Sequence, residues 1–221
     1  MTGADSKGEG MEGMEPLRQM VKEGKAGETA GRVRELLDGG ASPEDLMREA
    51  MIPAMEEVGD LFQRGEYFLP EMLIAARAMQ RGMEVLKPAL VSSGAGFPGK
   101  VVLGTVRGDI HDIGKNLVGM TLEGAGFEVV DLGTDVSPER FAEAVREHSP
   151  QVLGISALLT TTMLAMKDTV DILQEAGLRD TVKVMVGGAA VRREFASEIG
   201  ADFYGPDSTS ARDFARDVVT G

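Results

Sequence analysis

The hydrophobic periodicity of the chain changes near residue 95, and no other feature of the sequence limits its possible folds as strongly. Before this point, apolar residues recur at the spacing of amphipathic helices, as Leu17, Met20 and Val21 do. After it, short segments rich in β-branched residues alternate with further helical patterns. We therefore expect one chain with two units of different structural class.

The first unit, which we assign to residues 14–92, is predicted to be a bundle of about four or five helices. Pro53 falls inside one helical pattern and is expected to end or kink that helix, because proline lacks the N–H that a helix interior needs. Residues 1–13 are rich in Gly and acidic residues, and we expect them to be flexible. Small residues, Gly and Pro dominate residues 93–99, which indicates a linker.

The second unit, residues 100–221, has the strand–helix repeats that are typical of an α/β fold. Such repeats form a parallel sheet with helices on both faces, so we predict a five-stranded flavodoxin-like or Rossmann-like domain. The strands are expected at 101–106, 128–132, 152–156, 182–186 and 202–204, with helices beginning near residues 114, 138, 161, 191 and 208. Ligands of such sheets bind beyond the carboxyl ends of the strands, which directs attention to the loops after the first, third and fourth strands.

The loop after the first strand, Arg107–Asn116, contains one of the two histidines of the chain. By alternation Asp109 and His111 point the same way, and a carboxylate beside a histidine can orient the ring while its other nitrogen binds a metal. The plain alternative is a surface histidine that only forms hydrogen bonds. A zinc or iron site needs three or more protein ligands, and we find no such set near His111. If this residue binds a metal, a macrocycle must supply most of the coordination.

Composition excludes several other classes. The chain has 23 Lys and Arg against 36 Asp and Glu, a formal net charge of -13, which would repel nucleic acid. It has no cysteine, so disulfides, thiolate metal sites and a cysteine nucleophile are excluded. No secretory signal and no apolar segment of membrane-spanning length is visible. We therefore expect a cytoplasmic protein without nucleic-acid or membrane partners.

Three segments at predicted strand ends resemble the motifs of cobalamin-binding domains. Asp109-x-His111-x-x-Gly114, between a strand and a helix, resembles the D-x-H-x-x-G signature of that family. Ser156–Thr160 resembles its S-x-L-x-T segment, and Gly187–Gly188 resembles its G-G segment.

The first unit adds to this resemblance. Residues 58–62 and 68–70 resemble the helical cap that covers the corrin ring in methionine synthase and in corrinoid methyl carriers. From about Met14 onward, the chain therefore resembles the corrinoid-binding methyl-carrier proteins of methyltransferase systems.

The resemblance implies a role for each residue of the site. His111 would replace the cofactor's own lower ligand on cobalt, and Asp109 would hydrogen-bond the other nitrogen of its ring. Thr162 would be the hydroxyl partner of Asp109, so these three residues form the predicted catalytic set. The other predicted cofactor contacts come from the loops of the sheet and from the cap: Asp112, Ile113, Gly114, Ser156, Leu158, Thr160, Gly187, Gly188, Tyr204, Phe68 and Met72.

Ordinary structural roles stay open for several of these residues. A Gly pair suits a turn at a strand end, and the hydroxyls of Ser156 and Thr160 can cap local structure instead of binding the nucleotide tail. Tyr204 can be plain packing. Most methionines of the first unit are expected to fill its core, whereas Phe68 and Met72 are candidates for an apolar lid over the cofactor.

By resemblance, the chain is expected to carry a methyl group on cobalt between two enzymes. A donor-specific methyltransferase would load it, and a second methyltransferase would pass it to a tetrahydrofolate, tetrahydropterin or thiol acceptor. A reductive activation protein is a further expected partner. The carrier alone should not turn over, because no substrate pocket with its own acid, base or nucleophile is evident. The donor stays open among methanol, methylamines, glycine betaine and methoxylated aromatics, as do the lower base of the corrinoid and the oligomeric state.

Three other functions fit parts of the pattern. A light- or cofactor-sensing regulator would carry a basic DNA-binding domain before the cap, where this sequence has only the Gly- and acid-rich residues 1–13. A subunit of an adenosylcobalamin isomerase would need a substrate barrel, which we do not find. A flavodoxin-like domain without a corrinoid would leave the three ordered motifs as coincidence.

Overall fold

The computed structural model describes residues 13–93 and 97–221, apart from the side chain of Val91, and these form two compact units. The first comprises the described residues up to Phe97 together with Glu123–Gly126, and the second comprises Pro98–Leu122 and Phe127–Gly221. Nearly all of the predicted flexible N-terminus and the centre of the predicted linker lie outside the described residues. Within the described ranges, no helix combines the length and apolar character that crossing a bilayer requires.

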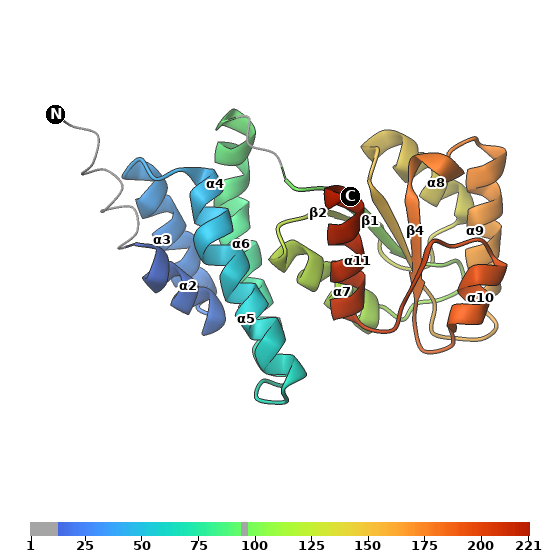
Figure 1. The fold of residues 1–221 in the computed structure, drawn as a ribbon, viewed down its shortest axis with the longest axis horizontal. Helices are drawn as coiled ribbons and strands as arrows, with labels where there is room; N and C mark the ends of the chain where they lie inside the picture. Colours follow the sequence, from blue (N-terminus) through green and yellow to red (C-terminus); the bar gives the residue numbers. More distant parts are fainter. Residues whose placement is uncertain (1–12, 94–96) are drawn as a thin grey trace. The chain divides into compact units, whose positions relative to one another are not determined.

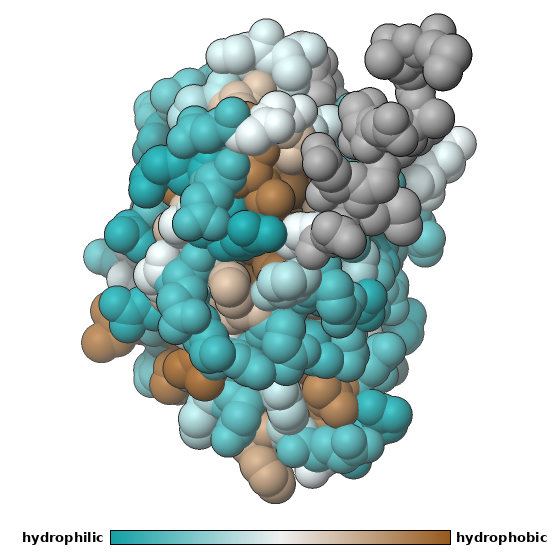
Figure 2. Space-filling model, turned by 90° about the vertical axis from the view of Figure 1, so that its left-hand side faces the viewer, coloured by the Kyte–Doolittle hydropathy of each residue, from teal (hydrophilic) through white to brown (hydrophobic). Residues whose placement is uncertain are grey.

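The first unit is helical (Figure 1), which confirms the predicted bundle. Its elements are α2 (Met14–Lys22), α3 (Ala26–Asp38), α4 (Pro43–Asp45), the π-helical turn η1 (Leu46–Met51), α5 (Ile52–Gln63) and α6 (Leu69–Ser93). The expected core positions are buried, since Leu17 and Val21 of α2 and Val33 of α3 are fully inaccessible to solvent. Hydrophilic residues cover most of the face of this unit in Figure 2, as expected for helices that turn one apolar stripe inward.

Pro53 does not interrupt the helical course of its segment. It is the second residue of α5, and the wider π-helical turn η1 comes directly before that helix. A proline in the first turn removes no hydrogen bond that the helix needs, and a wider turn relieves the clash of its ring with the preceding carbonyl. The expected break is therefore a local change of helix type.

The second unit is built on a five-stranded sheet in which all neighbouring strands are parallel (Figure 1). In chain order its elements are β1 (Lys100–Thr105), α7 (Ile113–Gly124), β2 (Glu128–Asp131), α8 (Pro138–His148), β3 (Val152–Ser156), α9 (Leu164–Glu175), η2 (Arg179–Thr181), β4 (Lys183–Gly187), α10 (Arg193–Glu198), β5 (Phe203–Gly205) and α11 (Ser208–Thr220). The strand order is β2-β1-β3-β4-β5. The predicted α/β fold with a parallel sheet is confirmed.

Element boundaries differ most from the prediction at the loops after β3 and β4. Helix α9 begins at Leu164 instead of near residue 161, and α10 begins at Arg193 instead of near residue 191. Before α9 the chain forms turns instead, in which the N–H of Met163 donates to the carbonyl of Leu159 at 3.0 Å and the N–H of Ala165 donates to the carbonyl of Thr162 at 3.0 Å. Hydrophobic periodicity does not record such bonds.

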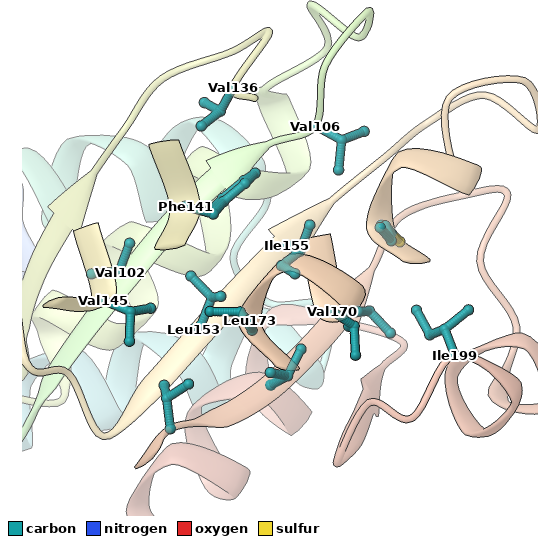
Figure 3. Packing of buried hydrophobic residues seen from close by; sticks show 14 of the residues in the cluster. Val102, Val106, Val136, Phe141, Val145, Leu153, Ile155, Val170, Leu173 and Ile199 are labelled. Carbon is teal, nitrogen blue, oxygen red and sulfur yellow. The ribbon is translucent and has the colours of Figure 1, made fainter. Parts of the chain in front are cut away.

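One face of the sheet packs against α8 and α9 to form the main core of the second unit (Figure 3). Val102 of β1 and Leu153 and Ile155 of β3 meet Phe141 of α8 there, and all four are buried. Gly104 gives Phe141 its place, because a Cβ at Gly104 would lie 2.6 Å from the ring. Burying a Phe side chain contributes about 1.5–3 kcal/mol, so this core holds β1 and β3 firmly side by side.

The strand order creates a switch point between β1 and β3. Strand β1 pairs with β2 on one side and with β3 on the other. Figure 1 shows α7, which follows β1, on one face of the sheet and α9, which follows β3, on the other. The loops after these two strands therefore diverge, and this is where ligands of doubly wound sheets bind.

Candidate functional site

Asp109 is the centre of a hydrogen-bond network that joins the loops after β1 and β3. Its side chain is completely buried. The carboxylate oxygen Oδ1 accepts a hydrogen bond from the backbone N–H of His111 at 3.0 Å and lies 2.7 Å from Nδ1 of the same residue. The other oxygen, Oδ2, accepts from the backbone N–H of Leu158 at 2.8 Å and from the Thr162 hydroxyl at 2.7 Å. The structure thus brings the three residues of the predicted catalytic set into contact.

His111 presents one ring nitrogen to the solvent side of this network. Its side chain is 48% exposed, and Nδ1 is engaged by Asp109. When the carboxylate accepts the Nδ1 hydrogen, the lone pair of the neutral ring lies on Nε2. Over residues 13–93 and 97–221, no group of three or more His, Cys, Asp or Glu is arranged to hold a metal. His111 can therefore supply one ligand to a metal whose other ligands come from outside this network.

The surroundings of Asp109 favour its ionised form. Burial by itself would raise its pKa, because it takes the carboxylate out of water. The hydrogen bonds from Thr162, from the backbone N–H groups of His111 and Leu158, and from the His111 ring act in the opposite direction and outweigh burial. The pKa of Asp109 is therefore held well below its ordinary value. A permanent negative charge beside Nδ1 keeps the ring of His111 in one tautomer and one orientation.

The loops after β1 and β3 carry exposed apolar side chains close in sequence to the residues of the network. Ile110 and Ile113 are 76% and 77% exposed, and Leu164 at the start of α9 is 62% exposed. Leu158 and Leu159 are exposed as well. Single exposed apolar residues are ordinary, but their concentration at one edge of a sheet marks a binding surface. An imidazole nitrogen that can donate to a metal, within an apolar surface, suits a flat ligand with a metal at its centre.

Comparison with known proteins decides the nature of this ligand. Two family models, each described as a B12 binding domain, match residues 99–214 and residues 14–87. The chain belongs to the B12-binding family. Its cofactor is a corrinoid, as the motifs predicted.

The relatives of this B12-binding chain are corrinoid proteins. Trimethylamine corrinoid protein 1 of Methanosarcina acetivorans is 46% identical over 187 residues, which are 84% of this chain and 87% of the relative. A corrinoid protein of Desulfitobacterium hafniense is 37% identical over 209 residues, or 93% and 97% of the two chains. Among solved structures, a methanol:cobalamin methyltransferase complex from Methanosarcina barkeri matches with a TM-score of 0.86 and 35% identity, covering 95% of this chain and 80% of that one. A cobalamin-binding protein from D. hafniense matches with a TM-score of 0.71 and 32% identity, covering 92% and 97%.

The carboxyl edge of the sheet fits a corrin ring at Gly114. This glycine is exposed in the first turn of α7, and a Cβ placed on it would meet nothing within 4 Å. Its backbone does not adopt a positive φ. The fold itself therefore gives no reason for a glycine, whereas a large planar ligand that approaches the backbone does. Gly114 directly follows the exposed Ile113 and lies three residues after His111 in the sequence.

The Gly pair at the end of β4 has a structural reason that does not involve the corrinoid. Gly188 has a φ of 125°, and a Cβ there would lie 2.0 Å from the carbonyl oxygen of Ala157. A Cβ on Gly187 would lie 2.8 Å from the carbonyl oxygen of Gly205. The backbone of Ala157, just after β3, and that of Gly205, the last residue of β5, thus leave no room for side chains at these two positions. The part of this pair in binding the nucleotide tail stays a prediction.

The other predicted contacts of the second unit lie in or beside the same loops. Ser156 is half-buried at the end of β3, and Thr160 is exposed in the turn that follows it. Asp112 is half-buried just before α7. Tyr204 of β5 packs against the hydrophobic core, which agrees with the plain-packing alternative.

The two lid candidates of the first unit differ in accessibility. Phe68, which precedes α6, is 65% exposed. Met72 is 3% exposed, so its side chain is part of the buried core and offers almost no surface to a ligand. Phe68 alone of the two offers an apolar surface to a ligand.

Two contributions to the site have no counterpart in the sequence prediction. Leu158 was predicted as a cofactor contact, but its backbone N–H, with that of Leu159 at 3.4 Å, also anchors Asp109. Thr105, the last residue of β1, donates its hydroxyl to the carbonyl of His111 at 3.0 Å. Backbone donors leave no trace in a sequence, and a lone threonine in a strand is usually read as a β-former.

Proposed function

We propose that this corrinoid protein carries a methyl group between a donor-specific methyltransferase and a second methyltransferase. The observation that carries the proposal is the buried Asp109 carboxylate that orients His111 and leaves Nε2 available at an apolar sheet edge. When bound, the corrinoid supplies a cobalt centre to which a methyl group can be attached and from which it can be removed. The relatives support the proposal, because they include proteins named for trimethylamine and dimethylamine and a methanol:cobalamin methyltransferase complex.

In this proposal His111 is the protein ligand of cobalt, and Asp109 adjusts how strongly it donates. The Nδ1 hydrogen lies between the ring and Oδ1, across 2.7 Å. A stronger hydrogen bond to the carboxylate makes Nε2 a better donor, and a weaker one makes it a poorer donor. Thr162 holds the opposite oxygen at 2.7 Å, so it sets how much negative charge remains at Oδ1.

We further propose a methylated amine as the methyl donor. The relatives named for trimethylamine are 46–47% identical to this chain, and those named for dimethylamine are 42% identical. The chain of the methanol:cobalamin methyltransferase complex is 35% identical. The acceptor, whether tetrahydrofolate, tetrahydropterin or thiol, stays a prediction, as do the reductive activation protein and the cytoplasmic location.

We propose that the first unit is a cap and that the second unit binds the corrinoid. The family matches at residues 14–87 and 99–214 support limits near residues 14–92 and 100–221. The exposed Phe68 is the residue of the cap that we propose to shield the carried group from water.

A spectrum of the reconstituted protein tests the role of His111. The full chain is incubated with hydroxocobalamin, freed of unbound cofactor and compared with His111→Ala by visible absorption. We expect both proteins to retain colour and the spectrum of the variant to shift towards that of a cobalt without imidazole. His148→Ala is the matched control, because the other histidine of the chain lies at the end of α8 beside Glu147. Identical spectra for His111→Ala and the parent would reject His111 as the ligand.

A coupled assay tests the carrier function. The reconstituted, reduced protein is mixed with trimethylamine, with and without a trimethylamine-specific methyltransferase, and free dimethylamine is measured. In a parallel mixture with methanol and a methanol-specific methyltransferase, the loss of methanol is measured. We expect demethylation only with both proteins present, and none with a methanol-specific methyltransferase and methanol. Turnover by the carrier alone would contradict the carrier role, and activity with methanol only would contradict the proposed donor.

A further inference from the structure

A second acidic residue, Asp135, contacts the backbone of the His111 loop. It lies in the segment between β2 and α8 and has a φ of 54°. Among the described residues other than glycine, only Asp135 and Ser149 adopt a positive φ. Asp tolerates this left-handed conformation better than most residues but still at some cost, so its presence calls for a compensating interaction.

The compensating interaction is a reciprocal pair of hydrogen bonds. The carboxylate of Asp135 accepts from the backbone N–H of Gly108 at 2.7 Å. Its own backbone N–H donates to the carbonyl of Asp109 at 3.0 Å. Gly108 itself has a φ of 80°, so two left-handed residues face each other across this contact. Asp135 therefore holds the chain on both sides of the peptide that joins Gly108 to Asp109.

The segment that carries Asp135 is itself fixed to the end of β1. The N–H of Thr105 donates to the carbonyl of Gly133 at 3.0 Å, and the N–H of Val136 donates to the carbonyl of Thr105 at 2.9 Å. At the end of β2, just before this segment, Asp131 forms an ion pair with Lys115, whose side chain is 3% exposed. Residues 131–136 thus bracket the His111 loop, with several hydrogen bonds before His111 and the ion pair of Lys115 after it.

We propose that Asp135 is a positioning residue for His111. The carboxylate of Asp109 is held by the loop after β3, and its backbone is held by Asp135 from the opposite side. Only with both anchors is the Asp109–His111 unit fixed relative to the sheet, so that Nε2 points to one place. The proposal rests on the proposed role of His111 as the cobalt ligand.

The test distinguishes the effect of the Asp135 carboxylate from the effect of its left-handed backbone conformation. Asp135→Gly removes the acceptor for Gly108 but keeps the left-handed conformation accessible. Asp135→Asn keeps an acceptor oxygen and tolerates the same conformation. Ser149→Gly is the matched control, because it removes the side chain of the other left-handed residue, at the C-terminal end of α8. In each full-length variant two quantities are measured: hydrogen exchange of the Gly108 amide in the cofactor-free protein by NMR, and hydroxocobalamin affinity by absorption titration.

We expect Asp135→Gly to speed exchange of the Gly108 amide and to weaken hydroxocobalamin binding roughly ten- to hundredfold, the usual effect of losing a residue that orients a metal ligand. Asp135→Asn should restore most of both properties, and Ser149→Gly should match the parent. Parental affinity in Asp135→Gly, or equal losses in the Gly and Asn variants, would overturn the proposal. The exchange of the Gly108 amide does not depend on cobalt. If Asp135→Gly speeds this exchange while His111→Ala leaves the cobalt spectrum unchanged, the result counts against His111 as the ligand and not against the hydrogen bonds of Asp135.

Discussion

Replacing Asp109 with asparagine should destabilise the protein although the two side chains have nearly the same shape. Asparagine exchanges one acceptor oxygen for an NH2 group. In one orientation this group faces the backbone N–H of Leu158, and in the other it faces the backbone N–H of His111. The Thr162 hydroxyl can turn to accept and the His111 ring can change tautomer, but a backbone N–H can do neither. Either orientation leaves at least one backbone N–H in the network without an acceptor.

The size of the effect follows from this count. An orphaned buried donor costs about 1–3 kcal/mol, and the loss of charge assistance in the remaining bonds adds about 1 kcal/mol. We expect Asp109→Asn to lower the free energy of unfolding by about 2–4 kcal/mol at pH 7, measured by urea denaturation of the cofactor-free protein. Asp112→Asn is the control in the same loop and should change stability by less than about 0.5 kcal/mol, as substitutions outside such networks do. If Asp109→Asn were as stable as the parent, the network described here would be wrong.

The pH dependence of this difference has a definite sign. Because the pKa of Asp109 is lowered in the folded protein, its carboxylate stabilises the fold fully above the ordinary Asp pKa of about 3.9. That stabilisation is lost as the pH falls from there towards the folded pKa. The stability difference between the parent and Asp109→Asn should therefore shrink as the pH falls below about 4. A difference that grows as the pH falls below about 4 would refute the assignment.

Three further substitutions separate structural from ligand-related roles. Gly188→Ala should lower the unfolding free energy by about 2–4 kcal/mol with or without cofactor, because its Cβ would meet the Ala157 carbonyl at 2.0 Å; a stable variant in thermal melts would contradict this. Gly114→Ala should leave the melting temperature unchanged or slightly higher but weaken hydroxocobalamin binding about tenfold, and unchanged binding would remove the argument that a ligand needs the space. Thr162→Val removes one of the hydrogen bonds to Asp109 and should cost about 1 kcal/mol in urea denaturation while the corrinoid is still retained; loss of all colour would show that Thr162 does more than hold the carboxylate.

Patterns that are local in the chain were sufficient to predict the elements and the centre of the site. A helical period before residue 95 and β-branched runs after it predicted the bundle and the five parallel strands, because side-chain spacing reflects the period of the backbone. Asp109 and His111 lie two residues apart, so their contact across 2.7 Å follows from a short turn. The resemblance to cobalamin-binding domains also predicted the corrinoid and the partnership with Thr162, which no spacing could indicate across 53 positions.

Only the tertiary structure decided how distant loops meet. The order β2-β1-β3-β4-β5 places the loop after β3 beside that after β1, so that the backbone of Leu158 anchors Asp109. Strand order is set by packing over the whole sheet, and backbone donors are the same for every residue type, so neither is written in a local pattern. The hydrogen bond between Asp135 and Gly108 and the burial of Met72 also depend on contacts between segments that are distant in the sequence. The sequence by itself predicted His111 as the cobalt ligand, and the fold decided which neighbours hold that residue in place, because such contacts join segments that only packing brings together.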